Sequence, residues 1–138
     1  MIESNNLRPG NLVKDNRVHC ARYVEVLDIC TSINRKNEIY VSNDNNFFWL
    51  KNTDVDGIKL SDELMDACAK RDTGSIFGGW LIPLGDDCGE FMRIVNDSII
   101  GWNFPFFGNT PVKIEFVHDL QNLVYALTKT TLSIKLPL

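Results

Sequence analysis

The sequence contains no long apolar run and no excess of basic residues. No stretch reaches the roughly 18 consecutive apolar residues that a membrane-spanning helix requires. The opening segment, MIESNNLRPG, has no basic start followed by an apolar stretch, so we expect neither a secretory signal nor a membrane anchor. The 18 acidic and 14 basic residues give a formal net charge of −4, which disfavours general attraction to nucleic acid or anionic lipid. These absences predict a cytoplasmic protein.

Cysteine is scarce, and the usual fingerprints of cofactor sites are missing. The four cysteines have spacings that match no zinc finger or ribbon; they are Cys20, Cys30, Cys68 and Cys88. We therefore interpret them as reduced, mostly buried thiols. The glycine-rich GSIFGG lacks the Lys and Ser/Thr of a phosphate-binding loop, and no GxGxxG follows a strand. The sequence accordingly predicts no cofactor and no metal.

The length and composition are those of a globular protein. The chain has 138 residues, of which 44% are hydrophobic and 23% charged, close to average globular usage. A chain of this length normally folds as one domain. We expect a single domain over residues 1–138, with barrel-like strands in 1–60 and a mixed region in 61–138.

The first 60 residues predict short antiparallel strands. YVEVLDI alternates between apolar and polar residues, and EIYV at 38–41 and FFWL at 47–50 flank the turn-forming SNDNN. The two segments predict a hairpin. Because FFWL has no polar position, we expect that strand to be covered on both sides. The pattern favours a small antiparallel barrel-like sheet of the SH3-like kind.

The remaining residues predict a helix, a meander and a second helix. Ser61 is a candidate N-cap for a helix over 61–70, closed by Lys70 and Arg71. WLIPL, EFMRIV and SIIGW predict three strands, with a tight turn at residues 96–97 between the last two. The fold class expected is therefore α+β, with a C-terminal amphipathic helix packed on the sheet. The loop 103–111 carries three phenylalanines that either fold back or form a binding surface: Phe104, Phe106 and Phe107.

FVHDLQNLVYALT, residues 116–128, has the period of an amphipathic helix. The positions expected to pack lie within one arc about 120° wide: Val117, Leu120, Leu123, Val124 and Leu127. The opposite arc gathers His118, Gln121, Asn122 and Tyr125. This polar arc is either a solvated helix face or, together with the three phenylalanines, a surface that binds a polar ligand or a partner protein.

Other motifs are weaker. NTDVDGIKLSDE, residues 52–63, fits part of a calcium-loop template, but Lys59 and Leu60 occupy unsuitable positions and the preceding segment is not helical. A small enzyme would need His118 or Cys88 beside a suitable partner. A nucleic-acid binder would use the basic N-terminal edge, formed by Arg8, Lys14, Arg17 and Arg22. No spacing favours the enzyme or the calcium site.

Three segments together resemble an uncharacterised family of small proteins encoded by phages and prophages of Bacteroides-type bacteria. They are NLRPGNLV, IKLSDELMDACA, and VKIEFVHDLQNLVYALT followed by LSI. Family members typically carry an LRIGN segment, a PLTEEWLLKFGF helix and a terminal VHQLQNLYFALTGEEL. This chain departs from the pattern at Pro9, in lacking the helix's aromatic residues, and at Lys129, where a glycine is usual. The resemblance implies that the calcium-like spacing is accidental.

The sequence favours a non-enzymatic binding module over the two alternatives. The resemblance implies a mobile-element accessory protein in a bacterial cytoplasm, with a role in host interaction or anti-defence. Its expected partner is a host or phage protein or a small polar ligand, with neither nucleic acid nor membrane expected.

Overall fold

The computed structural model describes residues 2, 4–17, 22–30, 37–74, 76, 78–84, 90–105 and 110–134. The chain divides into two compact units. The first comprises Met1–Ile58 and Phe116–Asn122, and the second comprises Lys59–Glu115 and Leu123–Leu138. Each unit holds one antiparallel sheet, so the fold class is α+β, as predicted. The single domain over residues 1–138 stays a prediction.

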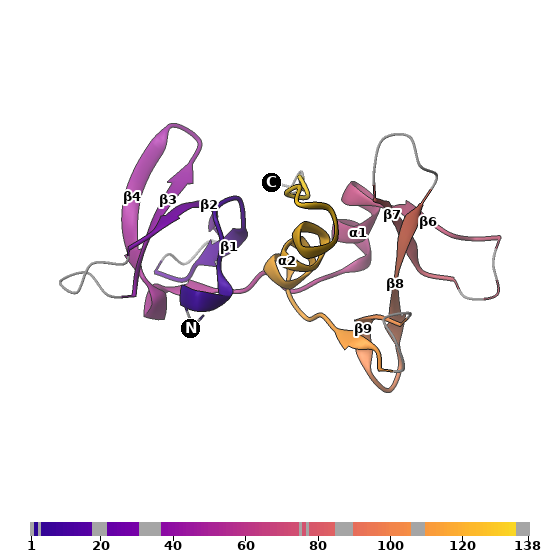
Figure 1. The fold of residues 1–138 in the computed structure, drawn as a ribbon. Coiled ribbons are helices and arrows are strands. Elements are labelled where there is room, and N and C mark those ends of the chain that lie inside the picture. The colour runs from indigo at the N-terminus through magenta and orange to yellow at the C-terminus, as the bar shows by residue number, and fades with distance from the viewer. Residues whose placement is uncertain are drawn as a thin grey trace. The chain divides into compact units, whose positions relative to one another are not determined.

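The sheet of the first unit has five strands in the order β4-β3-β2-β1-β5 (Figure 1). The elements are η1 (Ser4–Asn6), β1 (Leu12–Asp15), β2 (Arg22–Ile29), β3 (Glu38–Asn43), β4 (Asn46–Lys51), η3 (Asn52–Asp54) and β5 (Val55–Asp56). The first four strands form a meander, and β5 returns to pair with β1. Among the described residues neither this sheet nor the second one closes on itself, so the expected barrel is not confirmed.

The hairpin predicted between residues 38 and 50 is confirmed. Asn43 pairs with Asn46, which leaves Asp44 and Asn45 as a two-residue turn. Asp44 has a φ of 51°, the left-handed backbone that such turns require and that Asp and Asn tolerate. The turn fixes the pairing of every later residue in the two strands.

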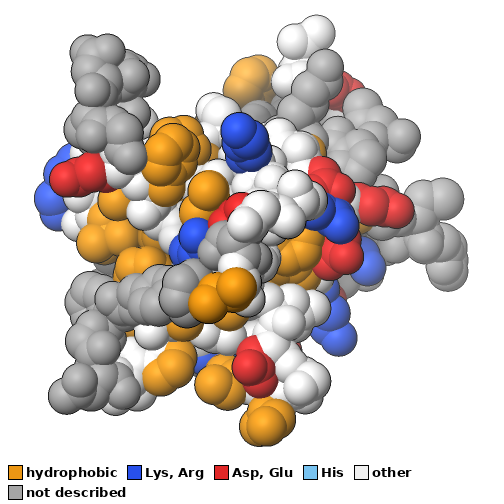
Figure 2. Space-filling model, turned by 90° about the vertical axis from the view of Figure 1, so that its right-hand side faces the viewer, with side chains coloured by type: hydrophobic (Ala, Val, Ile, Leu, Met, Phe, Trp, Pro, Cys, Tyr) orange, Lys and Arg blue, Asp and Glu red, His pale blue; other side chains and the backbone are white. Residues whose placement is uncertain are grey.

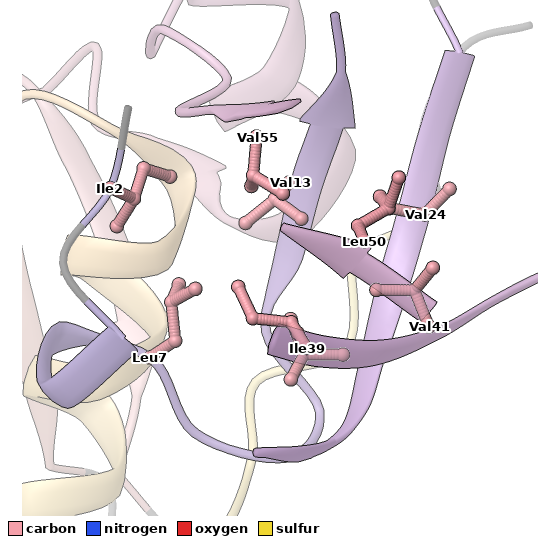
Figure 3. Close-up of a cluster of buried hydrophobic side chains, with 9 residues drawn as sticks. Ile2, Leu7, Val13, Val24, Ile39, Val41, Leu50 and Val55 are labelled. Atoms are coloured by element: carbon pink, nitrogen blue, oxygen red, sulfur yellow. The ribbon is translucent and has the colours of Figure 1, made fainter. Parts of the chain in front are cut away.

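The core of the first unit is aliphatic (Figure 3). Its members come from every strand of the sheet and from the N-terminal segment: Ile2, Leu7, Val13, Val24, Val26, Ile39, Val41, Leu50 and Val55. Alternation along each strand directs them to one face of the sheet. In β2 the alternation shifts at a bulge between Val26 and Asp28, after which Ile29 pairs with Ile39. Burial of each such side chain contributes roughly 1.5–3 kcal/mol.

Strand β4 is not covered on both sides, and that prediction is wrong. Leu50 is buried and Phe48 packs against the core, but Phe47 is 58% exposed and Trp49 is 37% exposed. β4 is the edge strand of the sheet, and its residues alternate between the core and the outer face. Phe48 and Leu50 of the run FFWL therefore face the aliphatic core, and Phe47 and Trp49 face outward.

The second unit contains the predicted meander (Figure 1). Its elements are α1 (Asp62–Cys68), β6 (Lys70–Arg71), β7 (Trp80–Pro83), β8 (Phe91–Asp97), β9 (Gly101–Phe104) and β10 (Val112–Lys113), with sheet order β10-β9-β8-β7-β6. The expected turn at residues 96–97 is displaced, because both belong to β8. The Asp97 carboxylate instead accepts the N–H groups of Ile99 and Ile100 and stabilises a turn over 98–100.

Helix α1 begins as predicted and ends early. The hydroxyl oxygen of Ser61 accepts a hydrogen bond of 3.2 Å from the N–H of Leu64. Lys70 and Arg71 do not close the helix; they form β6 and pair with β7. The Arg71 guanidinium donates two hydrogen bonds to Asp66, whose carboxylate also accepts the indole N–H of Trp80. These contacts bind the end of α1 to the sheet.

Helix α2 (Val117–Thr128) is amphipathic, but its apolar stripe is only partly buried. Val117 and Leu120 are fully buried and Val124 nearly so. Leu127, expected to pack, is 42% exposed. Helical period identifies a shared face, but it does not show how far a neighbouring surface extends along that face.

Among the described residues, no helix is long and apolar enough to cross a bilayer. Cys30 and Cys68 are free thiols, both half-buried. Burial raises the pKa of the Cys68 thiol to about 11, so it stays protonated at neutral pH.

Three glycines of the second unit provide a test of the fold. Gly79 has a φ of 81°, and a methyl group there would meet the Ile94 carbonyl oxygen and lie 2.8 Å from Val95 Cγ1. Gly78 also has a positive φ but faces open space, and Gly74 has neither constraint. We expect Gly79→Ala to cost about 3 kcal/mol, Gly78→Ala about 1 kcal/mol and Gly74→Ala less than about 0.5 kcal/mol. Urea unfolding measures the series, and equal costs would contradict the backbone described here.

Candidate functional site

The polar arc of α2 is not a solvated helix face in the first unit, although that was one of its two interpretations from the sequence. Gln121 is 1% exposed, and both polar atoms of its amide bind the backbone that leads into β1. Its Oε1 accepts the N–H of Leu12 at 2.8 Å, and its Nε2 donates to the carbonyl of Gly10 at 3.1 Å. Gln121 is therefore a structural residue, buried where a ligand from solvent would not reach it.

Asn122 continues the same polar contact. Its Oδ1 accepts the side-chain N–H of the buried Asn11 at 3.0 Å, and its Nδ2 donates to the carbonyl of Asn6 at 2.8 Å. Both of its polar atoms thus bind the N-terminal segment. The polar atoms of Gln121 and Asn122 therefore form hydrogen bonds within the first unit.

His118 is also buried, with 4% of its surface exposed. Its ring stacks on Phe116 at 5.5 Å between centroids, and its Nε2 lies 3.5 Å from a carboxylate oxygen of Asp119. Within the described residues its Nδ1 has no hydrogen-bond partner. Burial lowers the pKa of His118, although the Asp119 carboxylate opposes part of that effect. The histidine is uncharged at neutral pH.

Of the other predicted binding residues, the structure describes Tyr125 and Phe104, and both belong to the second unit. Tyr125 belongs to the second unit, where the Lys129 ammonium lies 5.7 Å from its ring centroid. Phe104 is half-buried at the end of β9, opposite Val112. Phe106, Phe107 and Cys88 lie outside the described residues.

Two of the four predicted basic residues balance a buried carboxylate. Asp15 is fully buried; Arg17 donates two hydrogen bonds of 3.1 Å to it, and Arg22 lies 3.9 Å away. The guanidinium groups lie 5.5 Å and 4.4 Å from the Phe48 ring centroid. Burial would raise the pKa of Asp15, but the hydrogen bond and charge of Arg17, with the charge of Arg22, outweigh it and lower the pKa.

The other two predicted basic residues are Lys14 and Arg8. Lys14 pairs in register with Tyr23 and Asp56, and Arg8 is half-buried in the N-terminal segment. The face drawn in Figure 2 is the right-hand side of Figure 1, where β6, β7 and β8 are labelled, and on it basic side chains lie next to acidic ones. Such a mixture gives that face little attraction for a phosphate backbone.

The described residues contain no group of three or more His, Cys, Asp and Glu side chains suited to a metal. The calcium-like segment instead begins with the 3-10 turn η3, continues as β5 and ends at the cap of α1. Asp56, one of its carboxylates, accepts a hydrogen bond of 3.1 Å from Asn16. The segment thus adopts secondary structure rather than a ligand loop.

A cleft of about 300 Å³ lies in the second unit, lined by apolar Pro83, Leu84 and Val124 and by hydroxyls that include Thr128. The Thr128 hydroxyl already donates to the Val124 carbonyl at 2.8 Å and accepts the N–H of Thr130 at 3.1 Å. Among the residues that the structure describes, no charged side chain lines the cleft. The cleft has room for a small molecule, but its described wall has few polar groups that could orient one.

The strongest candidate surface is on the outer side of β3 and β4. Tyr40 on β3 lies between Phe47 and Trp49 of β4, with ring centroids 6.4 Å and 5.0 Å away. We call these three side chains the aromatic face. Large exposed rings are costly in water and are typical of protein interfaces.

Two carboxylates lie beside the aromatic face. Glu25 of β2 pairs with Ser42, which pairs with Phe47, and Asp28 pairs with Tyr40, which pairs with Trp49. Glu25 and Asp28 are both exposed. The sequence-based prediction missed this surface, because it assigned FFWL to the interior.

Comparison with known proteins supplies no assignment: no family model matches the chain, and neither a curated protein nor a solved structure is significantly similar to it.

Gln121 provides a test of the internal role of the polar arc. Replacing it with alanine leaves the N–H of Leu12 and the carbonyl of Gly10 without their partner, at about 1–3 kcal/mol for each group. We expect Gln121→Ala to lower the free energy of unfolding by about 2–4 kcal/mol. Ala126→Gln, at an exposed position of the same helix, should change it by less than about 0.5 kcal/mol. Similar urea midpoints for both variants would contradict the internal role.

The buried His118 predicts a pH dependence of stability. Its pKa is lowered from 6.5 in the folded protein, so near and below pH 6.5 the unfolded chain binds a proton that the folded chain does not. Stability should be fully present above pH 6.5 and decrease as the pH falls, by at most about 1.4 kcal/mol per pH unit.

Urea unfolding between pH 5 and 7.5 measures this dependence, with His118→Gln as the comparison. The variant should show a smaller slope, and the second histidine, His19, is common to both proteins and cancels. Identical slopes would show that His118 titrates normally in the folded state.

Proposed function

We propose that the protein is a non-enzymatic binding module that contacts a partner protein through the aromatic face. The observation that carries this proposal is the grouping of Tyr40, Phe47 and Trp49 on one outer sheet surface, where Phe47 is 58% and Trp49 37% exposed. Tyr and Trp are enriched among the residues that dominate the energy of protein interfaces. Their rings bring a large contact area at a low cost in conformational entropy.

The size of the aromatic face indicates how much binding free energy other contacts with the partner must supply. Covering half of two such rings removes on the order of 200 Å² from water, which is worth about 5 kcal/mol. Association itself costs about 4–15 kcal/mol in lost translational and rotational freedom. The rings therefore anchor a partner, and neighbouring polar or charged contacts are needed for stable binding.

The chemistry of the described residues supports a binding role over an enzymatic one. His118 is buried and uncharged, with Phe116 and Asp119 as its neighbours. The Cys68 thiol is protonated at neutral pH. The alternative of a small enzyme at His118 or Cys88 stays a prediction, since Cys88 lies outside the described residues.

The nucleic-acid alternative is less favoured, because Arg17 and Arg22 already balance Asp15. Aromatic rings on a sheet can also stack on bases. The acidic residues beside this aromatic face oppose that use.

For the first unit we also propose the SH3-like small barrel expected from the sequence. Its support is the strand order, in which a four-stranded meander is followed by a short fifth strand that pairs with the first. A phage-encoded or prophage-encoded accessory role in a bacterial cytoplasm, in host interaction or anti-defence, is proposed from the resemblance of three sequence segments.

The proposed function is tested by asking whether binding of a partner protein requires the rings of Phe47 and Trp49. The purified protein is used to capture proteins from a lysate of a Bacteroides-type bacterium, alongside Phe47→Ala/Trp49→Ala and the control Ile76→Ala/Ile99→Ala. The control removes two apolar side chains that are also highly exposed but lie in the second unit. We expect a partner that the control retains and that the ring variant loses by at least about tenfold. Identical captured sets would contradict the proposal.

A further inference from the structure

We infer that the segment bound by the aromatic face is cationic: an extended stretch of a partner protein that presents Lys or Arg. This inference rests on the proposed function and names the chemistry of its partner. It comes from the position of Glu25 and Asp28, which lie in register with Phe47 and Trp49 across the intervening β3. Each of these two rows therefore has a ring on β4 and a carboxylate on β2, with β3 between them.

Among the strand residues that the structure describes, the basic side chains on this outer side of the sheet lie opposite acidic ones. On the same outer side, Lys51 pairs in register with Glu38, and Lys14 pairs with Asp56. Glu25 and Asp28 instead pair with the uncharged Ser42 and Tyr40. The surface beside the rings thus has two carboxylates with no basic side chain opposite them in the neighbouring strand β3.

Rings and carboxylates favour the same kind of ligand. The face of an aromatic ring carries the negative part of its quadrupole and attracts ammonium and guanidinium groups. A carboxylate attracts the same groups, and the aliphatic stem of Lys or Arg packs on a ring while its charge stays hydrated. Phosphates and acidic side chains would be repelled by both carboxylates.

The spacing suits an extended chain. Strands β4 and β2 are two strand spacings apart, about 10 Å, which is about three residues of extended peptide. A segment that crosses the sheet can therefore place one residue on the rings and a basic residue near Glu25 or Asp28. This arrangement supplies the charged contacts that the rings require.

The bulge in β2 places Asp28 on the outer side. Strict alternation from the buried Val26 would turn Asp28 toward the core, but the register shift pairs it with Tyr40. Its Oδ1 also accepts the N–H of Ile29 at 2.8 Å, which restricts the carboxylate. Bulges commonly redirect side chains at functional positions in this way.

The test begins with a displayed library of random twelve-residue peptides, selected against the wild-type protein and counter-selected against Phe47→Ala/Trp49→Ala. Peptides that require the rings are synthesised, and their dissociation constants are measured by fluorescence anisotropy at low and high salt. We expect these peptides to be rich in Lys or Arg and to bind more weakly at high salt.

The carboxylates are then tested with Glu25→Gln/Asp28→Asn, in which Asn keeps the oxygen that accepts the Ile29 N–H. We expect about tenfold weaker binding, the effect of two exposed charge contacts. The control Glu63→Gln/Glu90→Gln makes the same change in net charge at exposed positions of the second unit and should bind within about twofold of the wild type. Circular dichroism and urea midpoints confirm that each variant is folded.

The outcomes separate the two proposals. Ring-dependent peptides that are neutral or acidic, or that bind equally to the carboxylate variant, overturn the cationic partner and leave the aromatic face as a binding site. Ring-dependent binding of a thymidine oligonucleotide overturns it in favour of single-stranded nucleic acid. If no peptide and no oligonucleotide requires the rings, the proposed function fails as well.

Discussion

The amide of Gln121 is the interaction on which the first unit most depends. It joins a helix near the end of the chain to the backbone of Gly10 and Leu12, more than 100 residues earlier in the sequence. Asn122 and Asn11 extend the contact with a direct side-chain hydrogen bond. A buried amide of this kind is costly unless both of its polar atoms are satisfied, so the contact specifies one arrangement of the two segments. Gln121 and Asn122, which the sequence suggested as ligand-binding residues, therefore form hydrogen bonds within the fold instead.

The sequence predicts local elements well where the deciding chemistry is local. The Asp44 turn, the Ser61 cap and the three-stranded meander depend on residues a few positions apart, and all three are present. The polar arc of α2 was harder, because helical period shows which residues share a face and not what lies against it. For this reason the predictions for Gln121 and Leu127 were both wrong: the glutamine is buried and the leucine is exposed.

The aromatic face was missed for a similar reason, because the sequence of a strand does not show whether a neighbouring element covers each of its sides. FFWL has no polar residue, and an unbroken apolar run normally indicates a strand with two covered faces. At the edge of the sheet, β4 instead directs Leu50 inward and Trp49 outward. Tyr40 at the matching position of β3 was a usable signal, because two aromatic residues on facing strands of a predicted hairpin must lie on one side. The bulge in β2 carried no such signal, since neither glycine nor proline marks residues 26–28.

Charge has opposite consequences on the two sides of the first sheet. On the core side, Arg17 and Arg22 balance the buried Asp15 and cover Phe48, so the positive charge of the N-terminal edge is largely used within the protein. On the outer side, Glu25 and Asp28 accompany exposed rings, and basic residues do not face them in the adjacent strand. An ion pair inside the fold balances a buried charge, whereas unbalanced charge beside an exposed apolar surface selects what can cover that surface. The outer side is therefore the part of this unit on which we propose that a partner binds.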